Sequence, residues 1–356
     1  MTLDELRTAI DELDSRILEL LSERAKRALE IAEIKRSTQS AYYVPEREKA
    51  VFERLRALNR GPLPDSAIRV IYREVMSAIR SLEKNISVAY LGPNDTFSHM
   101  AALRVFGVTA DYHPLPTVAD IFTEVERKRI DYGLVPVESS MGGGVHDTLD
   151  RFISSDLKIV NEVLLRITQN LLSNSPMDKI ERVYSKDNAF IQCRNWLRVN
   201  LPNAKLIDVS STAEAARIAS QEAGAAAVAS ALAAKTYNVD ILVPSIEDSP
   251  NNYTRFFVMG RQLAKPTGKD KTSILISIKD RPGALYSLLT PFNQSDVNLT
   301  RIESRPSRRK AWEYVFFIDL IGHIDDPRIS EVLEKVHEYC VELKVLGSYP
   351  QGDVEE

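Results

Sequence analysis

Basic side chains recur through the first part of the chain at positions that could bind a small anion. Arg24 and Arg27 interrupt an apolar stripe, and Arg7, Lys35 and Arg47 lie before and after them. Arg24 and Arg27 taken alone could lie on a solvated helix face. Several cations that converge on the interior of a helical bundle, however, are costly to bury unless an anionic ligand pairs with them. The pattern therefore favours a site for a negatively charged small molecule.

A second set of polar residues lies in the middle of the chain, where predicted strands end. Glu138-Ser139, Ser185 and Thr254-Arg255 each occupy such a position. In largely parallel α/β sheets, ligands bind at the carboxyl ends of the strands. The hydroxyl, carboxyl and guanidinium groups suit the orientation of a polar substrate, although each serine or threonine taken singly is more often a helix cap.

The histidines and glycines predict neither a metal nor a cofactor. The five histidines show no ligand spacing such as HExxH. The run Gly142-Gly143-Gly144 lacks the lysine and hydroxyl residue of a phosphate-binding loop and the spacing of a dinucleotide fingerprint. A flexible loop is the simpler interpretation of that run.

The composition predicts a globular protein of two or three domains. The 356 residues are 44% hydrophobic and 27% charged, and their net charge of −4 gives no electrostatic reason to bind nucleic acid or an anionic membrane. The most apolar stretch, residues 225–234, is shorter than the roughly 18 residues of a membrane span. The N-terminus lacks a signal-peptide pattern, and Cys193 and Cys340 suggest no disulfide framework. We therefore expect a cytoplasmic protein with neither nucleic acid nor a membrane as partner.

The elements that must position the basic residues are helices. Residues 1–85 are rich in charge and poor in glycine, and apolar residues from Leu3 to Leu20 recur at spacings of three and four, which is typical of an amphipathic helix. Because residues 2–41 contain neither proline nor glycine, one helix of about 40 residues, roughly 60 Å long, is predicted. Second and third helices are predicted to start near Pro45 and Asp65. The long helix cannot bury its stripe within one chain, so we expect a dimer.

The order and spacing of these residues resemble the all-helical chorismate mutase domain. Four runs carry the resemblance: Leu6-Arg7, Leu20-Leu21-Ser22-Glu23-Arg24, Ile34-Lys35 and Tyr43-Val44-Pro45-Glu46-Arg47-Glu48. In that family two chains intertwine, and each active site takes an arginine from the partner's long helix. The resemblance implies that the carboxylates and ether oxygen of chorismate are held by Arg7 from the second chain, Arg24, Lys35 and Arg47. Glu48 is implied as the acceptor for the ring hydroxyl.

The implied reaction, a Claisen rearrangement of chorismate to prephenate, is unimolecular and needs no nucleophile or proton shuttle. Holding the compact conformer and stabilising charge on the ether oxygen must therefore supply the catalysis. Ile79 and Glu83 stand where well-known family members have serine and glutamine. Glutamine donates a hydrogen bond at any pH, whereas a carboxyl group must be protonated to do so. We therefore expect either that Glu83 is held protonated or that mutase activity falls as the pH rises.

The middle of the chain alternates predicted strands and helices and resembles prephenate dehydratase over residues 86–265. The matching runs are Tyr90-Leu91-Gly92-Pro93, Thr96-Phe97-Ser98, Val135-Pro136-Val137-Glu138, Thr148-Leu149-Asp150, Tyr184-Ser185, Gln192-Cys193 and Thr254-Arg255-Phe256. The family fold is two α/β lobes around a cleft, similar to a periplasmic binding protein. The resemblance implies that Thr254 donates to the leaving ring hydroxyl and that Arg255 anchors a carboxylate or shapes the cleft. Ser185 and Gln192 are implied as positioning contacts, with Glu138 and Ser139 in the same cleft.

Several residues of this region depart from the family pattern. Ser139 stands where the family has asparagine, and Gln169 replaces a usual histidine. A shorter side chain at Ser139 leaves open a weak dehydratase or a non-aromatising prephenate decarboxylase, although Thr254 argues against the latter. A third alternative is a non-catalytic, amino-acid-responsive regulator, which would not need the cation set of the helical domain.

Residues 271–350 are predicted to form strand, helix, strand, strand, helix, strand, the βαββαβ order of a ferredoxin-like sandwich. Arg281-Pro282-Gly283-Ala284-Leu285-Tyr286 and Glu303-Ser304-Arg305-Pro306 resemble the two signature motifs of an ACT domain. In that family paired domains bind phenylalanine at their interface. The implied effector residues are Gly283, Ala284, Leu285, Glu303, Ser304, Arg305 and Pro306. Together the resemblances imply a chorismate mutase and prephenate dehydratase, inhibited by L-phenylalanine and assembled as a homodimer or larger homo-oligomer.

Overall fold

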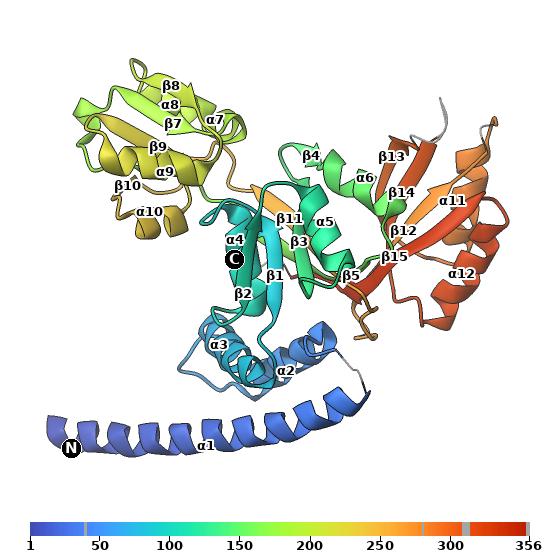
Figure 1. The fold of residues 1–356 in the computed structure, drawn as a ribbon, viewed down its shortest axis with the longest axis horizontal. Helices are drawn as coiled ribbons and strands as arrows, with labels where there is room; N and C mark the ends of the chain where they lie inside the picture. The colour runs from blue at the N-terminus through green and yellow to red at the C-terminus, as the bar shows by residue number, and fades with distance from the viewer. Residues whose placement is uncertain (39–40, 280, 308–313, 354–356) are drawn as a thin grey trace. The chain divides into compact units, whose positions relative to one another are not determined.

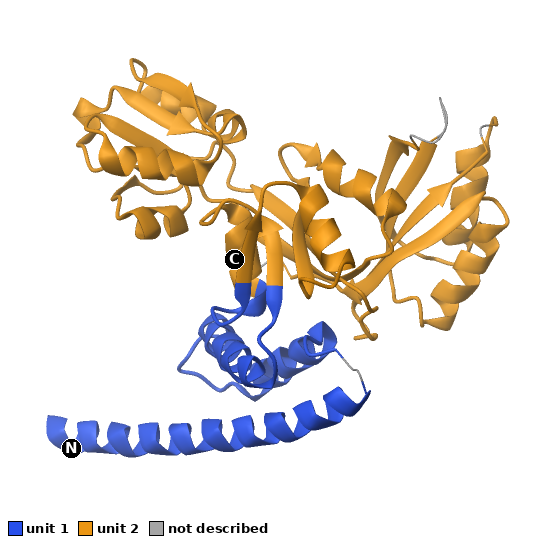
Figure 2. Cartoon of the chain, viewed as in Figure 1, with its two compact units in different colours: residues 1–87, 105–111 blue, residues 88–104, 112–356 orange. Residues whose placement is uncertain are grey.

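The computed structural model describes residues 1–38, 41–279, 281–307 and 314–353. The chain forms two compact units (Figure 2): a helical unit of Met1–Ser87 with Val105–Asp111, and a larger unit of the remaining residues. Within the described residues, no helix has both the length and the apolar character that crossing a bilayer requires.

Three helices make up most of the first unit (Figure 1): α1 (Leu3–Thr38), α2 (Pro45–Leu58) and α3 (Asp65–Glu83). The predicted helices are confirmed, and Pro45 occupies the first turn of α2 as expected. Residues 39–40, near the expected end of the long helix, lie outside the described part. Tyr43, Met76 and Ile79 are among the buried side chains that hold the short helices together.

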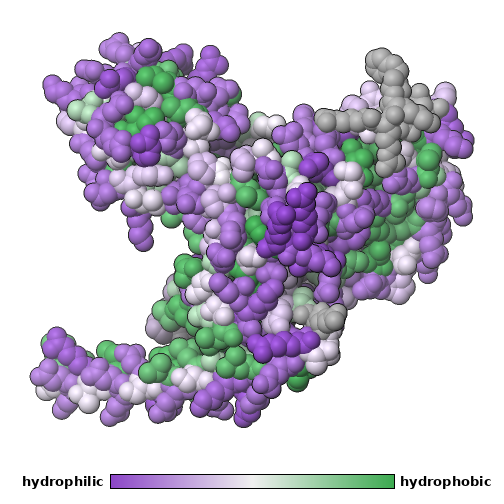
Figure 3. Space-filling view, in the orientation of Figure 1, coloured by the Kyte–Doolittle hydropathy of each residue, from purple (hydrophilic) through white to green (hydrophobic). Residues whose placement is uncertain are grey.

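The apolar stripe of α1 is exposed in the single chain. Leu3, Ile10 and Leu20 are 63%, 55% and 64% exposed, and Ala32 is the buried residue of this 36-residue helix. Figure 3 shows apolar surface along the helical unit. Each such side chain gains about 1.5–3 kcal/mol when it is fully buried, so the stripe strongly favours packing against another apolar surface.

The first lobe of the larger unit is built on one sheet with the strand order β2-β1-β3-β11-β5, in which β4 also pairs with β3. β1 and β3 run parallel, while β11 lies antiparallel between β3 and β5. Strand β11 joins the centre of this sheet after the chain has completed the second lobe. The elements are β1 (Ser87–Leu91), α4 (Phe97–Phe106), β2 (Asp111–Leu115), α5 (Val118–Glu126), β3 (Tyr132–Ser139), β4 (Gly143–Gly144), α6 (His146–Ser154), β5 (Lys158–Arg166) and β11 (Tyr253–Gly260).

The second lobe is a separate five-stranded sheet with the order β10-β6-β9-β7-β8. Its central strand β9 consists of small residues that are fully buried, which lets α9 pack closely against it. Two lobes of mixed α/β structure confirm the predicted fold class of the middle region. The elements are β6 (Asn170–Leu172), η1 (Met177–Lys179), β7 (Arg182–Ser185), α7 (Asp187–Gln192), α8 (Arg194–Asn200), β8 (Lys205–Asp208), α9 (Thr212–Gln221), β9 (Ala225–Ala229), α10 (Ala231–Tyr237) and β10 (Ile241–Val243).

The C-terminal region has the predicted βαββαβ order and forms an antiparallel sheet, β13-β14-β12-β15. The elements are β12 (Asp270–Ser277), α11 (Ala284–Gln294), β13 (Leu299–Pro306), β14 (Tyr314–Ile321), α12 (Pro327–His337) and β15 (Glu342–Pro350). Residues 308–313, which include the expected start of the third strand at Trp312, lie outside the described part.

Both faces of this C-terminal sheet are buried. On one face, Ile274 packs with Leu288 of α11 and Val332 of α12. On the other face, Leu275 and its neighbours on the sheet share a single core with the first lobe. Since successive strand residues point to opposite faces, neighbouring β12 residues enter different cores. This shared core explains why the larger unit is one compact body although its motifs come from two families.

Candidate active sites

The helical unit brings together charged residues from all three of its helices. Lys35 of α1 contacts Glu83 of α3, with Nζ 3.3 Å from Oε2. Glu48 of α2 contacts Arg80 of α3, with Oε1 2.6 Å from Nη1. Three of the predicted mutase residues, Lys35, Glu48 and Glu83, therefore lie in one cluster.

Glu48 has an unusual environment. Burial raises its pKa, and Arg80 and Lys35 oppose that shift by favouring the ionised carboxylate. The carboxylate is therefore both desolvated and paired, which suits a group that must accept a hydrogen bond from a substrate hydroxyl.

Arg80 is a member of this cluster that the sequence analysis missed. It donates from Nη2 to the carbonyl oxygen of Phe106 at 3.0 Å, and its guanidinium carbon lies 5.4 Å from the centre of the Tyr43 ring. The available signal was a basic residue next to Ile79 on the buried side of an amphipathic helix. Arg80 anchors Glu48 and fixes the end of α3 against the rest of the unit.

Within a single chain, Arg7 lies far from this cluster. Arg7 lies 28 residues before Lys35 on the same helix, a distance of about 42 Å along the axis. Its contact is with Asp4, one turn away. Arg24 is half-buried and Arg47 is exposed. Arg7 therefore cannot reach the cluster of its own chain and can take part only in the cluster of another chain.

In the dehydratase-like region, strand register brings distant residues side by side. On the antiparallel strands β11 and β3, Thr254 lies opposite Ser139 and Arg255 lies opposite Glu138. Opposite residues on such strands have their Cβ atoms about 4.5–5.5 Å apart. Thr254 and Ser139 are both half-buried, so neither residue is sealed in the core of the lobe.

Arg255 points away from this pair, because side chains alternate along a strand. It contacts Glu162 at 2.7 Å and Asp319 at 2.5 Å, and it donates to the Tyr349 hydroxyl at 3.1 Å. Burial alone lowers the pKa of Arg255, but Tyr349, Asp319 and Glu162 together raise it. The guanidinium is thus fully charged and engaged by the protein, which favours a role in shaping the site over contact with substrate.

The predicted residues of the second lobe have protein partners. The Ser185 hydroxyl is fully buried and donates to the carbonyl oxygen of Val228 at 2.7 Å. Gln192 accepts a hydrogen bond from the side chain of Gln169 at 2.9 Å. Ser185 therefore holds β7 to β9, and Gln192 is oriented by the residue that replaces the family's usual histidine.

Comparisons with known proteins match these regions in order. The family model for chorismate mutase type II covers residues 6–84, that for prephenate dehydratase covers 88–264, and that for the ACT domain covers 272–338. A relative from Aquifex aeolicus (strain VF5), named a bifunctional chorismate mutase/prephenate dehydratase, is 51% identical over 99% of both chains. The chain belongs to the bifunctional chorismate mutase/prephenate dehydratase family.

Two further relatives support the membership. A protein of the same name from Stutzerimonas stutzeri is 46% identical over 98% of both chains. Among solved structures, a prephenate dehydratase in complex with L-Phe from Arthrobacter aurescens matches with a TM-score of 0.70 and 34% identity. That match covers 75% of this chain and 90% of the other.

The ACT motifs of this family member lie on two elements. Gly283 adopts a left-handed conformation, with φ of 74°, where it caps α11, and Ala284 and Leu285 begin that helix. Strand β13 carries Glu303, Ser304, Arg305 and Pro306. Along β13 the odd-numbered side chains are half-buried and the even-numbered ones are exposed.

Two half-buried side chains of β13, Arg301 and Arg305, contact the dehydratase lobe. Arg305 binds the Asp150 carboxylate of α6, with Nη2 3.1 Å from each oxygen. Glu303 pairs with Arg301 on the same strand. Glu303 and Arg305 were predicted to belong to an effector site. The contact of Arg305 with the dehydratase lobe was missed, because a motif does not reveal which face of its strand is covered.

Asn252 is a second residue that the sequence analysis missed. It is 1% exposed, and neither its amide nitrogen nor its amide oxygen has a hydrogen-bond partner among the described residues. The Oε1 atom of Gln169 is in the same situation. Buried polar atoms are normally satisfied by protein, water or ligand. Asn252 lies two residues before Thr254, so these amides can serve a bound molecule near the candidate site.

Proposed function

We propose that this chain rearranges chorismate to prephenate and then converts prephenate to phenylpyruvate, with inhibition by L-phenylalanine. The observation that carries the proposal is that site residues come together within each of the two domains whose families catalyse these steps. In the helical unit they are Lys35, Glu48 and Glu83. In the larger unit they are Thr254 and Ser139.

The mutase step fits a site made of fixed charges. Lys35 and the arginines Arg24 and Arg47 hold the carboxylates of chorismate, while Glu48 accepts from its ring hydroxyl. Breaking the carbon–oxygen bond places negative charge on the ether oxygen, which Lys35 stabilises, with Glu83 beside it as the candidate second donor. Arg7 comes from a second chain, so the proposal includes a homodimer or a larger homo-oligomer. The exposed stripe of α1 supports this assembly.

The dehydratase step fits a site of hydroxyls. Prephenate loses its ring carboxylate as carbon dioxide, and the electron pair left behind completes the aromatic ring as the ring hydroxyl departs as hydroxide, which takes a proton from solvent to become water. Thr254 donates a hydrogen bond to the departing hydroxyl, and Ser139 and Gln192 orient the substrate. Because aromatisation drives the step, modest assistance from neutral donors is sufficient.

The regulatory proposal rests on the ACT domain. The solved relative from Arthrobacter aurescens is described as a complex with L-Phe, and the motifs on α11 and β13 are present here. We propose that L-phenylalanine binds at these motifs and favours a less active dehydratase.

We further propose three functional domains, residues 1–85, 86–265 and 271–350, which the family matches support. A cytoplasmic location is also proposed, and the free thiols Cys193 and Cys340 are consistent with it.

The test supplies purified protein with chorismate and follows the products with and without L-phenylalanine, using L-tyrosine as a control. Phenylpyruvate whose formation is reduced by L-phenylalanine is the expected result. Prephenate that accumulates without phenylpyruvate would overturn the dehydratase assignment. A non-aromatic keto acid would instead identify the middle domain as a decarboxylase.

A further inference from the structure

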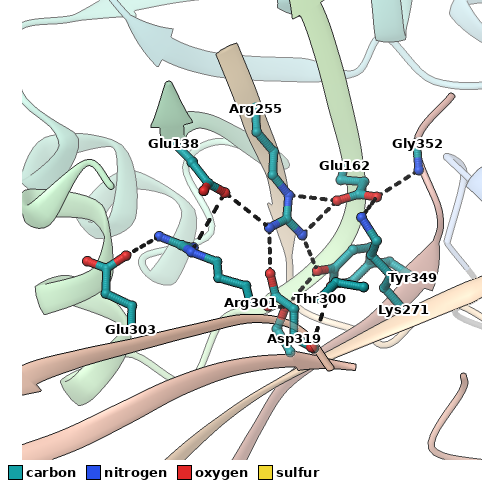
Figure 4. A network of polar contacts seen from close by, with 11 residues as sticks. Glu138, Glu162, Arg255, Lys271, Thr300, Arg301, Glu303, Asp319, Tyr349 and Gly352 are labelled. Carbon is teal, nitrogen blue, oxygen red and sulfur yellow. Dashed lines mark hydrogen bonds and ion pairs between the residues drawn. The ribbon is translucent and has the colours of Figure 1, made fainter. Parts of the chain in front are cut away.

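A buried network of charges joins the first lobe of the dehydratase region to the ACT sheet (Figure 4). At its centre, Arg255 on β11 binds Glu162 on β5 and Asp319 on β14. The side chains of these three residues are 8%, 0% and 5% exposed. Lys271 on β12 also contacts Glu162, with Nζ 2.9 Å from Oε1. The two domains thus share ion pairs that water cannot readily screen.

Adhesion alone does not explain this network. The same two domains already share an apolar core that includes Phe257, Leu275 and Phe317. A buried ion pair loses much of its attraction to desolvation, and apolar side chains of similar volume often stabilise a protein as well. What charged groups add is directional geometry, because a guanidinium with several carboxylate partners fits in one orientation.

The oriented groups are immediate neighbours of the reacting pair. Arg255 follows Thr254 in the chain, and Glu138 precedes Ser139. The Arg255 Nη1 lies 3.8 Å from Oε2 of Glu138 across the same ladder. A displacement of the backbone at Arg255 or Glu138 would therefore move the adjacent peptide units, and with them the Thr254 and Ser139 hydroxyls.

Arg301 connects this ladder to an ACT motif. Its Nε lies 3.7 Å from Oε2 of Glu138, while its Nη2 is paired with Glu303 of the second motif. The Arg301 side chain is 9% exposed. One guanidinium therefore contacts a carboxylate beside the reacting pair and a carboxylate of the proposed effector site through different nitrogens.

We propose that Asp319 and Arg301 of the ACT domain are positioning residues of the dehydratase, acting through Arg255 and Glu138 on the Thr254–Ser139 pair. The inference rests on the proposed dehydration of prephenate. It means that the dehydratase site is incomplete without the ACT sheet, and that Arg301 is the residue through which a change at Glu303 reaches the reacting groups.

The first test replaces Asp319 with Asn in the full chain, which keeps the shape of the side chain but removes its charge. We expect dehydratase kcat to fall about 10- to 100-fold with a smaller change in KM, since a small misplacement of reacting groups has effects of this size. The matched control is Lys344→Met. Lys344 also crosses between the two domains, where Nζ donates to the carbonyl oxygens of Phe152 and Ser155, away from the reacting pair.

The second test compares Arg301→Lys with Arg301→Met. Lysine has one nitrogen where Arg301 uses two, so it cannot reproduce the two separate contacts with Glu138 and Glu303 in their present positions. We expect Arg301→Met to lower dehydratase kcat, Arg301→Lys to restore part of the loss, and both variants to weaken inhibition by L-phenylalanine. Binding of L-phenylalanine and the melting temperature are measured for each variant to check that the larger unit is folded.

The outcomes separate the two proposals. If wild-type protein forms no phenylpyruvate from prephenate, the proposed function is wrong. If wild-type protein is active but Asp319→Asn and Lys344→Met have the same kcat, the positioning role is wrong. If Asp319→Asn does not fold, the Arg301 pair decides: equal kcat values for wild type, Arg301→Lys and Arg301→Met overturn the inference.

Discussion

The two candidate active sites of this chain are assembled in different ways. The mutase cluster consists of long charged side chains from three helices, and one chain supplies only part of the predicted set, with Arg7 about 42 Å from Lys35 along α1. The dehydratase pair consists of short hydroxyl side chains whose separation is set by one strand register, Thr254 opposite Ser139. We therefore propose that the first site depends on association between chains, whereas the second depends on the contacts that hold the central strands of a sheet in place.

The largest expected effect tests whether the two sites are independent. Thr254→Val keeps the shape of the side chain and removes its hydroxyl, so we expect dehydratase kcat to fall by about 10³-fold while mutase activity is unchanged. Lys35→Met should do the reverse, because it removes a cation from the mutase cluster and leaves the larger unit intact. Both activities are measured on each variant, starting from chorismate and from prephenate. A variant that loses both activities would contradict the separation of the sites.

The next prediction tests the dependence of the mutase on a second chain. Replacing Ile10 and Leu13 by Glu places charges on the exposed stripe of α1, where both side chains are more than half exposed in the single chain. We expect dissociation of the α1 contact and a loss of mutase activity of at least about 100-fold, with a much smaller loss of dehydratase activity. Sedimentation gives the oligomeric state. Val199→Glu, at a more exposed apolar residue of α8, is the control and should change neither property. Equal effects of the two changes would argue against the shared mutase site.

The sequence predicted the fold more completely than it predicted the sites. Helix periodicity and Pro45 located the helices, and the strand–helix order located the C-terminal sandwich, because these features depend on local patterns. Arg80, Asp319 and Arg301 were missed. Each owes its role to partners far along the chain, and no spacing reveals that β13 and β14 turn charged side chains toward the dehydratase lobe. The motif residue Arg255 was found, but its contacts with the ACT sheet depend on the same long-range packing.

The two candidate sites should also differ in their response to pH, because the mutase cluster contains ionisable carboxyl groups and the hydroxyl pair does not. Glu83 can donate to the ether oxygen only when protonated, so activity should fall as the pH rises. Burial raises the pKa of Glu48. As the pH falls, its ionised form, which accepts the substrate hydrogen bond, is therefore lost at a higher pH than in an ordinary glutamate, and mutase activity should also fall on the acid side. We expect a bell-shaped mutase profile.

Glu83→Gln provides the control for this prediction. Glutamine donates at any pH, so the variant should lose the alkaline limb, keep the acid limb and show several-fold higher activity near pH 8. Steady-state rates from pH 5 to 8.5 give the profile. A flat wild-type profile, or an alkaline limb that survives in Glu83→Gln, would show that Glu83 does not act as a donor.

The smallest expected effect concerns how closely the ACT motif approaches the dehydratase sheet. A Cβ atom at Gly144 would lie 2.5 and 2.7 Å from the carboxylate oxygens of Glu303, and Gly144 pairs with Glu138 on the neighbouring strand. Gly144→Ala should therefore displace the Glu303 carboxylate and, through Arg301, the Glu138 side chain. Because Glu303 is a flexible side chain, we expect only a two- to fivefold change, about 1 kcal/mol or less, in the L-phenylalanine concentration that halves dehydratase activity.

Gly142→Ala is the matched control for this change. An added Cβ there would meet its nearest neighbour, the Cβ of Ser139, at an ordinary 3.8 Å, and neither glycine has a positive φ. Inhibition curves for the two variants should therefore differ. If they coincide, contact between the ACT motif and this edge of the sheet does not contribute to inhibition.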